Sequence, residues 1–228
     1  MKKYSKRFKG SVEQFDGDKV YSLKEAIAIL KKMKLPKFNA SVDIHFRLNV
    51  DTKKSDQMVR GTVVLPHGTG KKVRVAVFCK GEHERQARDA QADYVGANDL
   101  MEKVSKGFMD FDCAIATPEM MKDLSRLGKI LGPRGLMPSP KAGTVTNDIV
   151  KAIEDVRKGK VEFRVDKQAG IHLSVGKIDF NEEQLYDNAS CVMEALTEAK
   201  PHTVKGKFIK NASIAVTMNP AVKLTVAS

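Results

Sequence analysis

The stretch GKILGPRGLMPSPKAGTVT, residues 128–146, combines residue types that can hold an anion. It contains four glycines and three prolines, and Lys129, Arg134 and Lys141 are spaced through it. Glycine allows backbone conformations that other residues resist, and proline fixes φ and removes an amide donor, so a long helix or a central strand is excluded. The stretch therefore predicts a shaped loop that presents three cations. It serves either as a surface linker or as a binding loop for a polyanion.

Two glycine motifs resemble nucleotide-binding loops only in part. The phosphate-loop pattern around Gly68–Lys71 would require a glycine at position 65 and a hydroxyl at position 72, where the chain has Leu65 and Lys72. No expected strand leads directly into Gly132–Gly135, as a dinucleotide fingerprint would require. Neither motif predicts a cofactor.

Catalytic and metal-binding patterns are weak as well. The five histidines show no metal-ligand spacing with the three cysteines. Asp110 and Asp112 flank Phe111 at an expected strand end, where a carboxylate could act as an acid beside an α/β crevice. A solvated strand end is the simpler interpretation of these two residues. The sequence thus predicts no catalytic residue, no metal site and no small-molecule substrate.

Charge favours an anionic partner. The 228 residues carry 40 Lys and Arg against 28 Asp and Glu, which gives a net charge of +12 and a pI near 9.5. Nucleic acid is the first partner that such an excess suggests, and an acidic membrane surface or an acidic protein is the second. No apolar run approaches the roughly eighteen residues that span a bilayer. The unpaired, scattered cysteines indicate reduced thiols, and we expect a cytoplasmic protein without a membrane partner.

The elements that must position these residues begin after a basic arm, residues 1–21, that we expect to be solvated and mobile. Ser22 and Glu25 form a capping box at the start of a helix that Pro36 ends. Apolar and polar residues then alternate over 42–50, which predicts a strand with one buried face. His45 lies on the polar face, where a solvated histidine is the simpler interpretation than a ligand.

The middle of the chain has a different pattern. Residues 73–79 and 111–116 are mostly apolar, as in strands covered on both faces. Between them we expect a helix over 82–91, a short strand at 94–95 and a helix capped by Asn98. Further helices are expected from Pro118 and over 147–158. This alternation of strand and helix predicts a small parallel α/β sheet.

One-sided strands return near the end of the chain. Residues 161–165 and 171–175 alternate, Asn181 and Gln184 form a second capping box, and two strands are expected over 208–218 and 222–226.

We therefore expect an outer domain of residues 1–68 plus 160–228, interrupted by an inserted domain of residues 69–159, with hinges near 66–70 and 157–160. Residues 1–68 carry 15 cations and 7 acids, residues 69–159 carry 16 and 13, and residues 160–228 carry 9 and 8. The outer domain is thus the stronger candidate for binding a polyanion.

The residues of 128–146 closely resemble the signature loop of the L-one family of large-subunit ribosomal proteins. The resemblance covers essentially the whole chain, because further segments are similar to the family in order and spacing. These segments are VRGTVVLPHGTGKKVRV, ADYVGANDL, MDFDCAIATPEMM, VEFRVDKQAGIH and KPHTVKGKFIKNASIAVTM. The lack of an acidic extension or a transit segment indicates a member of the bacterial type. The resemblance implies an α/β protein: an α+β outer domain of split β-α-β type and an inserted three-layer, Rossmann-like α/β domain.

The resemblance also implies a role. Proteins of this family bind large-subunit rRNA, form a mobile lateral stalk beside the exit-site tRNA and assist its release. They are monomers within the ribosome, and in bacteria they commonly repress their own messenger by binding its leader. The alternatives are an RNA-binding regulator only, or an enzyme whose catalytic unit is the inserted domain.

The family's main RNA contacts correspond here to Lys37, Phe38, Ser41, Thr217 and Met218. Weaker candidates are Glu25, Arg164, Asp166, Lys167 and His172, and a secondary RNA or tRNA surface comprises Lys129, Arg134 and Lys141. Without the resemblance, Phe38 and Met218 would be interpreted as core residues.

The sequence departs from the family at the last contact. The family usually has Thr-Thr-Met-Gly there, whereas this chain has Val216-Thr217-Met218-Asn219. Asn211 also stands where a small hydroxyl residue is common. Because glycine adopts positive φ freely and asparagine only with some cost, we expect a displaced or weaker contact at Asn219.

Overall fold

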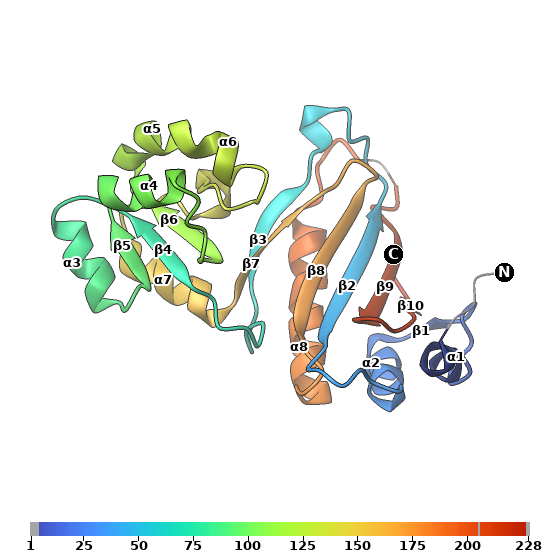
Figure 1. Ribbon diagram of the computed structural model, residues 1–228. Coiled ribbons are helices and arrows are strands. Elements are labelled where there is room, and N and C mark those ends of the chain that lie inside the picture. Colours follow the sequence, from blue (N-terminus) through green and yellow to red (C-terminus); the bar gives the residue numbers. More distant parts are fainter. Residues whose placement is uncertain (1–4, 205, 227–228) are drawn as a thin grey trace. The chain divides into compact units, whose positions relative to one another are not determined.

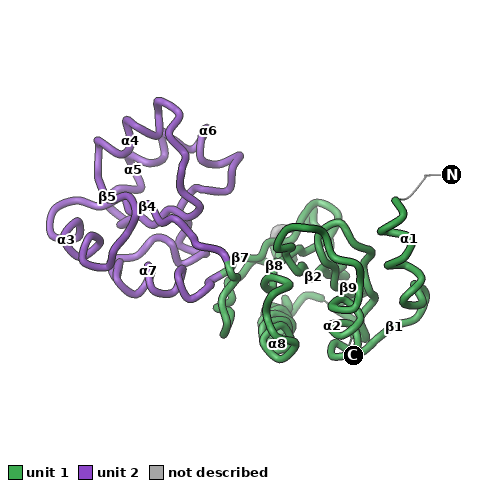
Figure 2. The backbone as a smooth tube through the Cα atoms, turned by 60° about the horizontal axis from the view of Figure 1, so that its bottom comes forward, with its two compact units in different colours: residues 1–70, 161–228 green, residues 71–160 purple. Residues whose placement is uncertain are grey.

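The computed structural model describes residues 5–204 and 206–226 and forms two compact units. Unit 1 takes residues 1–70 and 161–228, and unit 2 takes residues 71–160 (Figure 2). The backbone thus leaves unit 1 once and returns to it once. Within the described residues, no helix is both long and apolar enough to cross a bilayer.

Unit 1 is built on a five-stranded sheet (Figure 1). Its helices are α1 (Lys6–Val12), α2 (Leu23–Lys32) and α8 (Glu182–Glu198), with a 3-10 turn at Ser55–Gln57. Its strands are β1 (Val20–Tyr21), β2 (Ser41–Leu48), β3 (Arg60–Val64), β7 (Lys160–Arg164), β8 (Gly170–Lys177), β9 (Ile209–Val216) and β10 (Val222–Leu224). The strand order is β1-β10-β9-β2-β8, and β3 and β7 form a separate two-stranded sheet.

Strand β2 lies between β8 and β9, antiparallel to both. Its apolar residues Val42, Ile44, Phe46 and Leu48 are buried, as the alternation predicts. They pack into one core with buried residues of α2 and α8. The intervening residues, including His45, lie on the opposite face. His45 is paired across the sheet with His172 of β8 and Ser213 of β9.

Both predicted capping boxes of unit 1 are confirmed. Ser22 and Glu25 cap α2, and Asn181 and Gln184 cap α8, so that each side chain satisfies an amide at the start of its helix. The N-terminal arm that the sequence predicts contains a helix among its described residues: the Ser5 side chain caps α1, and most of residues 5–21 are exposed. The sequence does not predict this short helix, because cations dominate the segment and its few apolar residues show an incomplete helical spacing.

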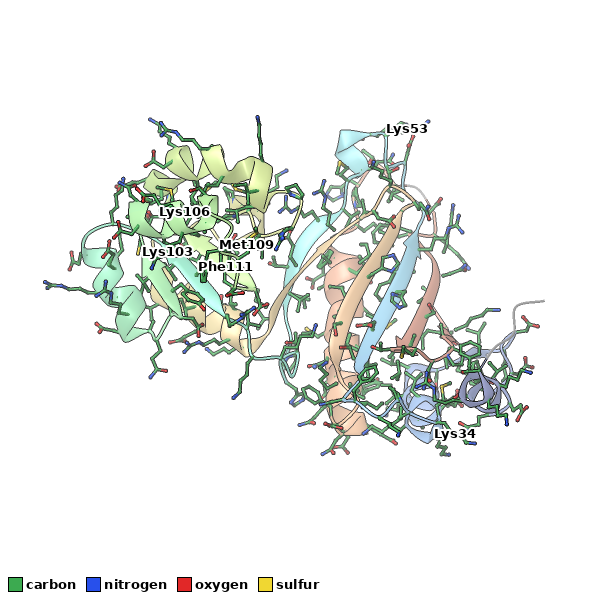
Figure 3. The ribbon with its side chains drawn as sticks, in the orientation of Figure 1. Lys34, Lys53, Lys103, Lys106, Met109 and Phe111 are labelled. Carbon is green, nitrogen blue, oxygen red and sulfur yellow. The ribbon has the colours of Figure 1, made fainter. Side chains whose placement is uncertain are left out.

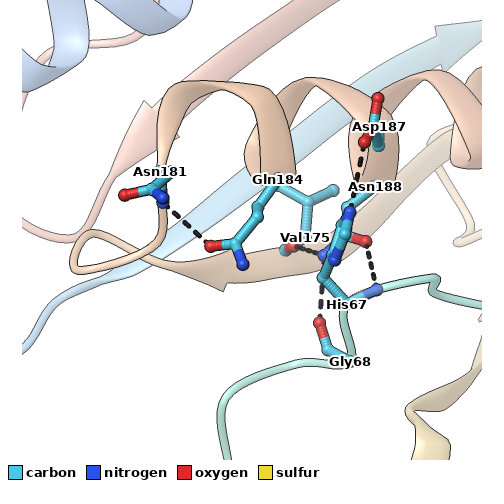
Figure 4. A network of polar contacts seen from close by, with 7 residues as sticks. All are labelled: His67, Gly68, Val175, Asn181, Gln184, Asp187 and Asn188. Carbon is cyan, nitrogen blue, oxygen red and sulfur yellow. Dashed lines mark hydrogen bonds and ion pairs between the residues drawn. The ribbon is translucent and has the colours of Figure 1, made fainter.

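A buried asparagine on α8 fixes the segment where the chain leaves unit 1 (Figure 4). Asn188 is 0% exposed, and its Oδ1 accepts from the amide of His67 at 3.1 Å. Its Nδ2 donates to the carbonyls of Gly68 at 3.0 Å and Val175 at 2.8 Å. The His67 side chain lies 3.1 Å from the Asp187 carboxylate. One side chain therefore joins α8, β8 and the departing loop.

Unit 2 contains a three-stranded parallel sheet in the order β5-β4-β6. The strands are β4 (Val75–Phe78), β5 (Tyr94–Gly96) and β6 (Cys113–Ala116). The α-helices are α3 (Glu82–Asp89), α4 (Asn98–Ser105), α5 (Met121–Leu124), α6 (Gly128–Leu131) and α7 (Ile149–Lys158). The 3-10 helices are η2 (Pro118–Met120), η3 (Ser125–Leu127) and η4 (Pro140–Ala142).

Helices cover both faces of this sheet. Ala76 and Phe78 of β4 pack on one face with buried residues of α4, α5, η3 and α6. Val75 and Val77 pack on the other face with buried residues of α3 and α7. All four residues of β4 are buried, which explains why the run shows no polar alternation. The predicted α/β class, with its three-layer inserted part, is confirmed.

Two predicted helix starts in unit 2 differ from the structure. The expected cap Asn98 is the first residue of α4, and the cap position is taken by Ala97 without a side-chain hydrogen bond. The helix expected from Pro118 begins as a 3-10 turn before α5. Neither helix begins with a capping box like that of Ser22 and Glu25. We infer that packing against the sheet sets where each of these two helices begins.

Candidate nucleic-acid interface

The five main predicted contacts lie at or beside the beginning of β2. Ser41 opens this strand, and its carbonyl accepts from the Thr217 amide at 3.0 Å and from the Thr217 hydroxyl at 3.2 Å. Lys177 donates to the Ser41 hydroxyl at 3.0 Å. The sheet therefore brings together Ser41 and Thr217, which are 176 residues apart in the sequence.

Phe38 and Met218 are solvent-exposed apolar side chains near these hydroxyls. Phe38 is 51% exposed, and Met218, just beyond β9, is 65% exposed. The alternative interpretation of both as core residues is therefore wrong. Lys37 is exposed beside Phe38. Folded RNA is recognised through shape, 2′-hydroxyls and stacking, so apolar groups flanked by hydroxyls and a cation suit an RNA surface.

The turn that carries Met218 adopts a left-handed backbone conformation at an unexpected residue. Met218 has φ of 67°, whereas Asn219, which replaces the family's glycine, has no positive φ. The Asn219 amide donates to the Val216 carbonyl at 2.9 Å, and its side chain donates to the Lys34 carbonyl at 3.4 Å. The replacement therefore causes no left-handed strain at Asn219, and its side chain adds a bond within unit 1.

The weaker candidates Asp166, Lys167 and His172 lie at the opposite end of β2. The Asp166 carboxylate accepts from the amides of Gly170 at 2.6 Å and Gln168 at 2.8 Å. These bonds, the Gly170 amide first, lower the pKa of Asp166. The Asp166 carboxylate therefore stabilises the turn between β7 and β8, and because its pKa is lowered it stays ionised.

His172 connects Asp166 to a histidine that the sequence interpretation left in solvent. His172 Nε2 lies 3.7 Å from the Asp166 carboxylate, and its Nδ1 lies 2.9 Å from Nδ1 of His45. Burial, and then the charge of His172, lowers the pKa of His45. A hollow of about 250 Å³ here is lined by both histidines, Asp166 and Arg47. His45 is thus part of this end of the surface; the alternation placed it on the polar face, but only strand pairing identifies its neighbour.

Among the described residues, no hydrogen bond joins Glu25 or Arg164 to the residues at the beginning of β2 or to those around Asp166 and His172. Glu25 accepts from the Ser22 amide at 3.0 Å, and this bond, as the largest cause, lowers its pKa. Its carboxylate therefore serves the start of α2. Arg164 is exposed at the end of β7. Their roles in binding RNA stay predictions.

The stretch of residues 128–146 in unit 2 consists of short helical turns held by its apolar residues. Leu131 and Ala142 are buried, and the Ala116 amide donates to the Thr144 carbonyl at 2.9 Å, which joins the stretch to β6. The three cations of the predicted secondary surface, Lys129, Arg134 and Lys141, are all exposed. The stretch therefore has a packed inner side and a cationic outer side.

The acids considered for catalysis in unit 2 do not gather at a cavity. A hollow of about 550 Å³ lies beside β5 and is lined by Tyr94, Lys103 and Phe108 among others, but not by Asp110 or Asp112. Asp112 pairs with Arg74 at 3.1 Å, and the hydrogen bond from that guanidinium lowers the pKa of the carboxyl. An ionised carboxylate is a poor proton donor. Among the described residues, no group of three or more His, Cys, Asp or Glu side chains is placed to hold a metal ion.

Comparison with known proteins supplies the family. Residues 30–220 match the sequence model described as the ribosomal protein L1p/L10e family. A protein of Thermosipho melanesiensis named large ribosomal subunit protein uL1 is 52% identical over 229 residues, covering 100% of this chain and 99% of the relative. The protein of the same name from Onion yellows phytoplasma is 50% identical over 222 residues, covering 97% and 96%. The chain therefore belongs to the ribosomal protein L1p/L10e family.

Proposed function

We propose that this protein is a structural constituent of the large ribosomal subunit and that unit 1 binds large-subunit rRNA. The proposal rests chiefly on the surface at the beginning of β2, where exposed Phe38 and Met218 lie near the hydroxyls of Ser41 and Thr217. Exposed apolar side chains beside cations and hydroxyls suit RNA better than they suit water. The excess of cations over acids in residues 1–68 supports the same assignment.

In the ribosome, we propose, the protein forms the mobile lateral stalk, and movement of unit 2 helps deacylated tRNA to leave the exit site. The same surface of unit 1 would bind the leader of the protein's own messenger and repress its translation. A shared surface is the economical hypothesis because both ligands would be folded RNAs of similar shape. The alternative is an RNA-binding regulator that does not serve the ribosome.

The two units give a direct test of the rRNA assignment. We expect residues 5–70, joined by a short linker to residues 161–226, to retain most of the affinity of the full chain for an rRNA transcript. Unit 1 has its own core, so the joined halves should fold. Binding is measured by filter retention at several salt concentrations, where the slope of log K against log[salt] should be about −0.7 to −0.9 for each phosphate neutralised.

Residues 71–160 alone serve as the control in the same titration. If this fragment retains the affinity and the joined halves lose it, the assignment of rRNA binding to unit 1 is wrong. An excess of rRNA transcript should also displace the messenger leader from the joined halves. If both RNAs remain bound together, the shared surface is wrong.

The cations of residues 128–146 form the secondary surface, which could meet rRNA or a departing tRNA, and the release of tRNA tests it. Replacing Lys129, Arg134 and Lys141 with glutamine is expected to slow release of deacylated tRNA by about three- to tenfold, through loss of up to three exposed phosphate contacts. Stopped-flow measurement of exit-site tRNA on reconstituted ribosomes checks this. The matched control replaces three other exposed cations of unit 2, which are Lys103 and Lys106 (both labelled in Figure 3) and Lys122. Equal release rates for both triple variants would make the stretch a scaffold only.

A further inference from the structure

The left-handed turn at Met218 is held by bonds to three other segments of unit 1. The Thr217 amide donates to Ser41, which opens β2, and the Asn219 side chain donates to the Lys34 carbonyl after α2. The third bond comes from α1: Arg7 Nη2 donates to the Met218 carbonyl at 3.1 Å. This last bond joins residues that are 211 positions apart.

The hydrogen bond from Arg7 acts on Met218, whose backbone adopts a left-handed conformation that residues with a Cβ atom disfavour. A residue with a Cβ atom disfavours positive φ, so Met218 keeps a φ of 67° only if its surroundings fix it. A hydrogen bond from a charged guanidinium is stronger than one between neutral groups. Arg7 is half-buried, whereas the neighbouring cations Lys6 and Lys9 are exposed. Arg7 is thus the cation of α1 that is committed to the turn.

Helix α1 is itself held close to this place. Ser11 is 0% exposed, and its hydroxyl donates to the Arg7 carbonyl at 3.2 Å. A Cβ added at Gly10 would lie 3.6 Å from the Lys34 amine, so the helix backbone lies against that side chain. Lys34 also provides the carbonyl that Asn219 binds. Helix α1, the end of α2 and the Met218 turn therefore form one local assembly.

We infer that Arg7 is a positioning residue of the RNA contact: it fixes the Met218 turn in the conformation that exposes the methionine side chain toward RNA. The inference rests on the proposed binding of rRNA by unit 1. Arg7 acts through the Met218 backbone, without itself neutralising a phosphate. RNA thus meets a turn that is already ordered, and the entropy cost of ordering it is absent from binding.

Arg7→Ala in the full chain should weaken binding to an rRNA transcript by about five- to tenfold, the loss expected for one hydrogen bond at an exposed site. The slope of log K against log[salt] should stay unchanged. Arg7→Lys should recover part of the affinity, because an amine can still donate to the carbonyl. Lys9→Ala removes the same charge from the same helix without touching the turn, and it should cost less than twofold.

Two further measurements separate positioning from direct contact. In a double-mutant cycle, Arg7→Ala should cost little when Met218 is already alanine, because the side chain that it positions is gone. In the free protein, Arg7→Ala should speed hydrogen exchange of the Asn219 amide, which closes the turn onto Val216. Native circular dichroism of Arg7→Ala checks that unit 1 still folds.

The outcomes distinguish the inference from the function on which it rests. If the unaltered chain does not bind the transcript, the proposed function fails, while the exchange measurement still tests the turn. If the chain binds and Arg7→Ala binds equally well, only the inference fails. A salt slope lowered by about 0.7 to 0.9 in Arg7→Ala would make Arg7 a phosphate ligand and overturn the positioning role. Additive losses in the cycle would overturn it as well.

Discussion

Replacing Phe38 and Met218 together with alanine is expected to weaken binding of the full chain to large-subunit rRNA by about a hundredfold or more. Stacking of a base on an aromatic side chain contributes about 1–3 kcal/mol, and burial of a methionine about 1.5–3 kcal/mol. Each 1.4 kcal/mol is about tenfold in affinity. The two side chains are 51% and 65% exposed, so most of this gain arises only when RNA covers them.

The fold should be unaffected by this double replacement. Exposed substitutions usually change the free energy of unfolding by less than about 0.5 kcal/mol, and alanine keeps the Cβ atom that Met218 already places at positive φ. Met58→Ala is the matched control, because Met58 is an exposed methionine of unit 1 outside the proposed surface. Isothermal titration with the rRNA transcript gives both affinities. A double variant that binds as tightly as Met58→Ala would remove these residues from the site.

Asn188→Leu is expected to destabilise unit 1 by about 3–5 kcal/mol, although leucine has a similar volume. The replacement leaves the His67 amide and the carbonyls of Gly68 and Val175 without their partner. An orphaned buried polar group costs about 1–3 kcal/mol, and Val175 is fully enclosed. Native-state hydrogen exchange of the β8 amides measures the loss for unit 1 alone.

Asp187→Ala provides the comparison for Asn188→Leu on the same turn of α8. Asp187 is exposed, and among the residues that the structure describes its side chain pairs with His67 alone, so its loss should cost less than about 1 kcal/mol. Similar losses for the two variants would mean that the buried asparagine is not what fixes the departing loop.

The sequence predicts an element well where the signal is local. Ser22 with Glu25, and Asn181 with Gln184, sit three positions apart and interact with each other, so the starts of α2 and α8 follow from spacing alone. Alternation similarly predicts the buried face of β2. By contrast, α1 has seven residues in a segment rich in cations. Ser5 supplies a local cap, but the spacing of the residues does not show that Ser11 is buried.

The candidate site is predictable in its members but not in its arrangement. The family resemblance indicates Phe38 and Met218, but only the structure shows that both are exposed. Arg7 and His45 were missed because each depends on a partner more than a hundred residues away. The positive φ falls on Met218 and not on Asn219, because the hydrogen bonds of the whole turn decide which residue adopts it.

The interrupted course of the chain has a consequence for the order in which the protein becomes functional during its synthesis. All three strands of unit 2 lie between Val75 and Ala116, and α7 completes its cover by Lys158. Unit 2 can therefore fold while the remaining residues are still being added, since domains generally fold as units during translation. In unit 1, however, β2 can pair only once β8 and β9 have been made, and these strands lie about 130 to 170 residues later in the sequence. The surface at Ser41 and Thr217 thus forms only after β9 has left the exit tunnel, so the proposed binding of RNA at this surface requires that the chain up to Thr217 has emerged.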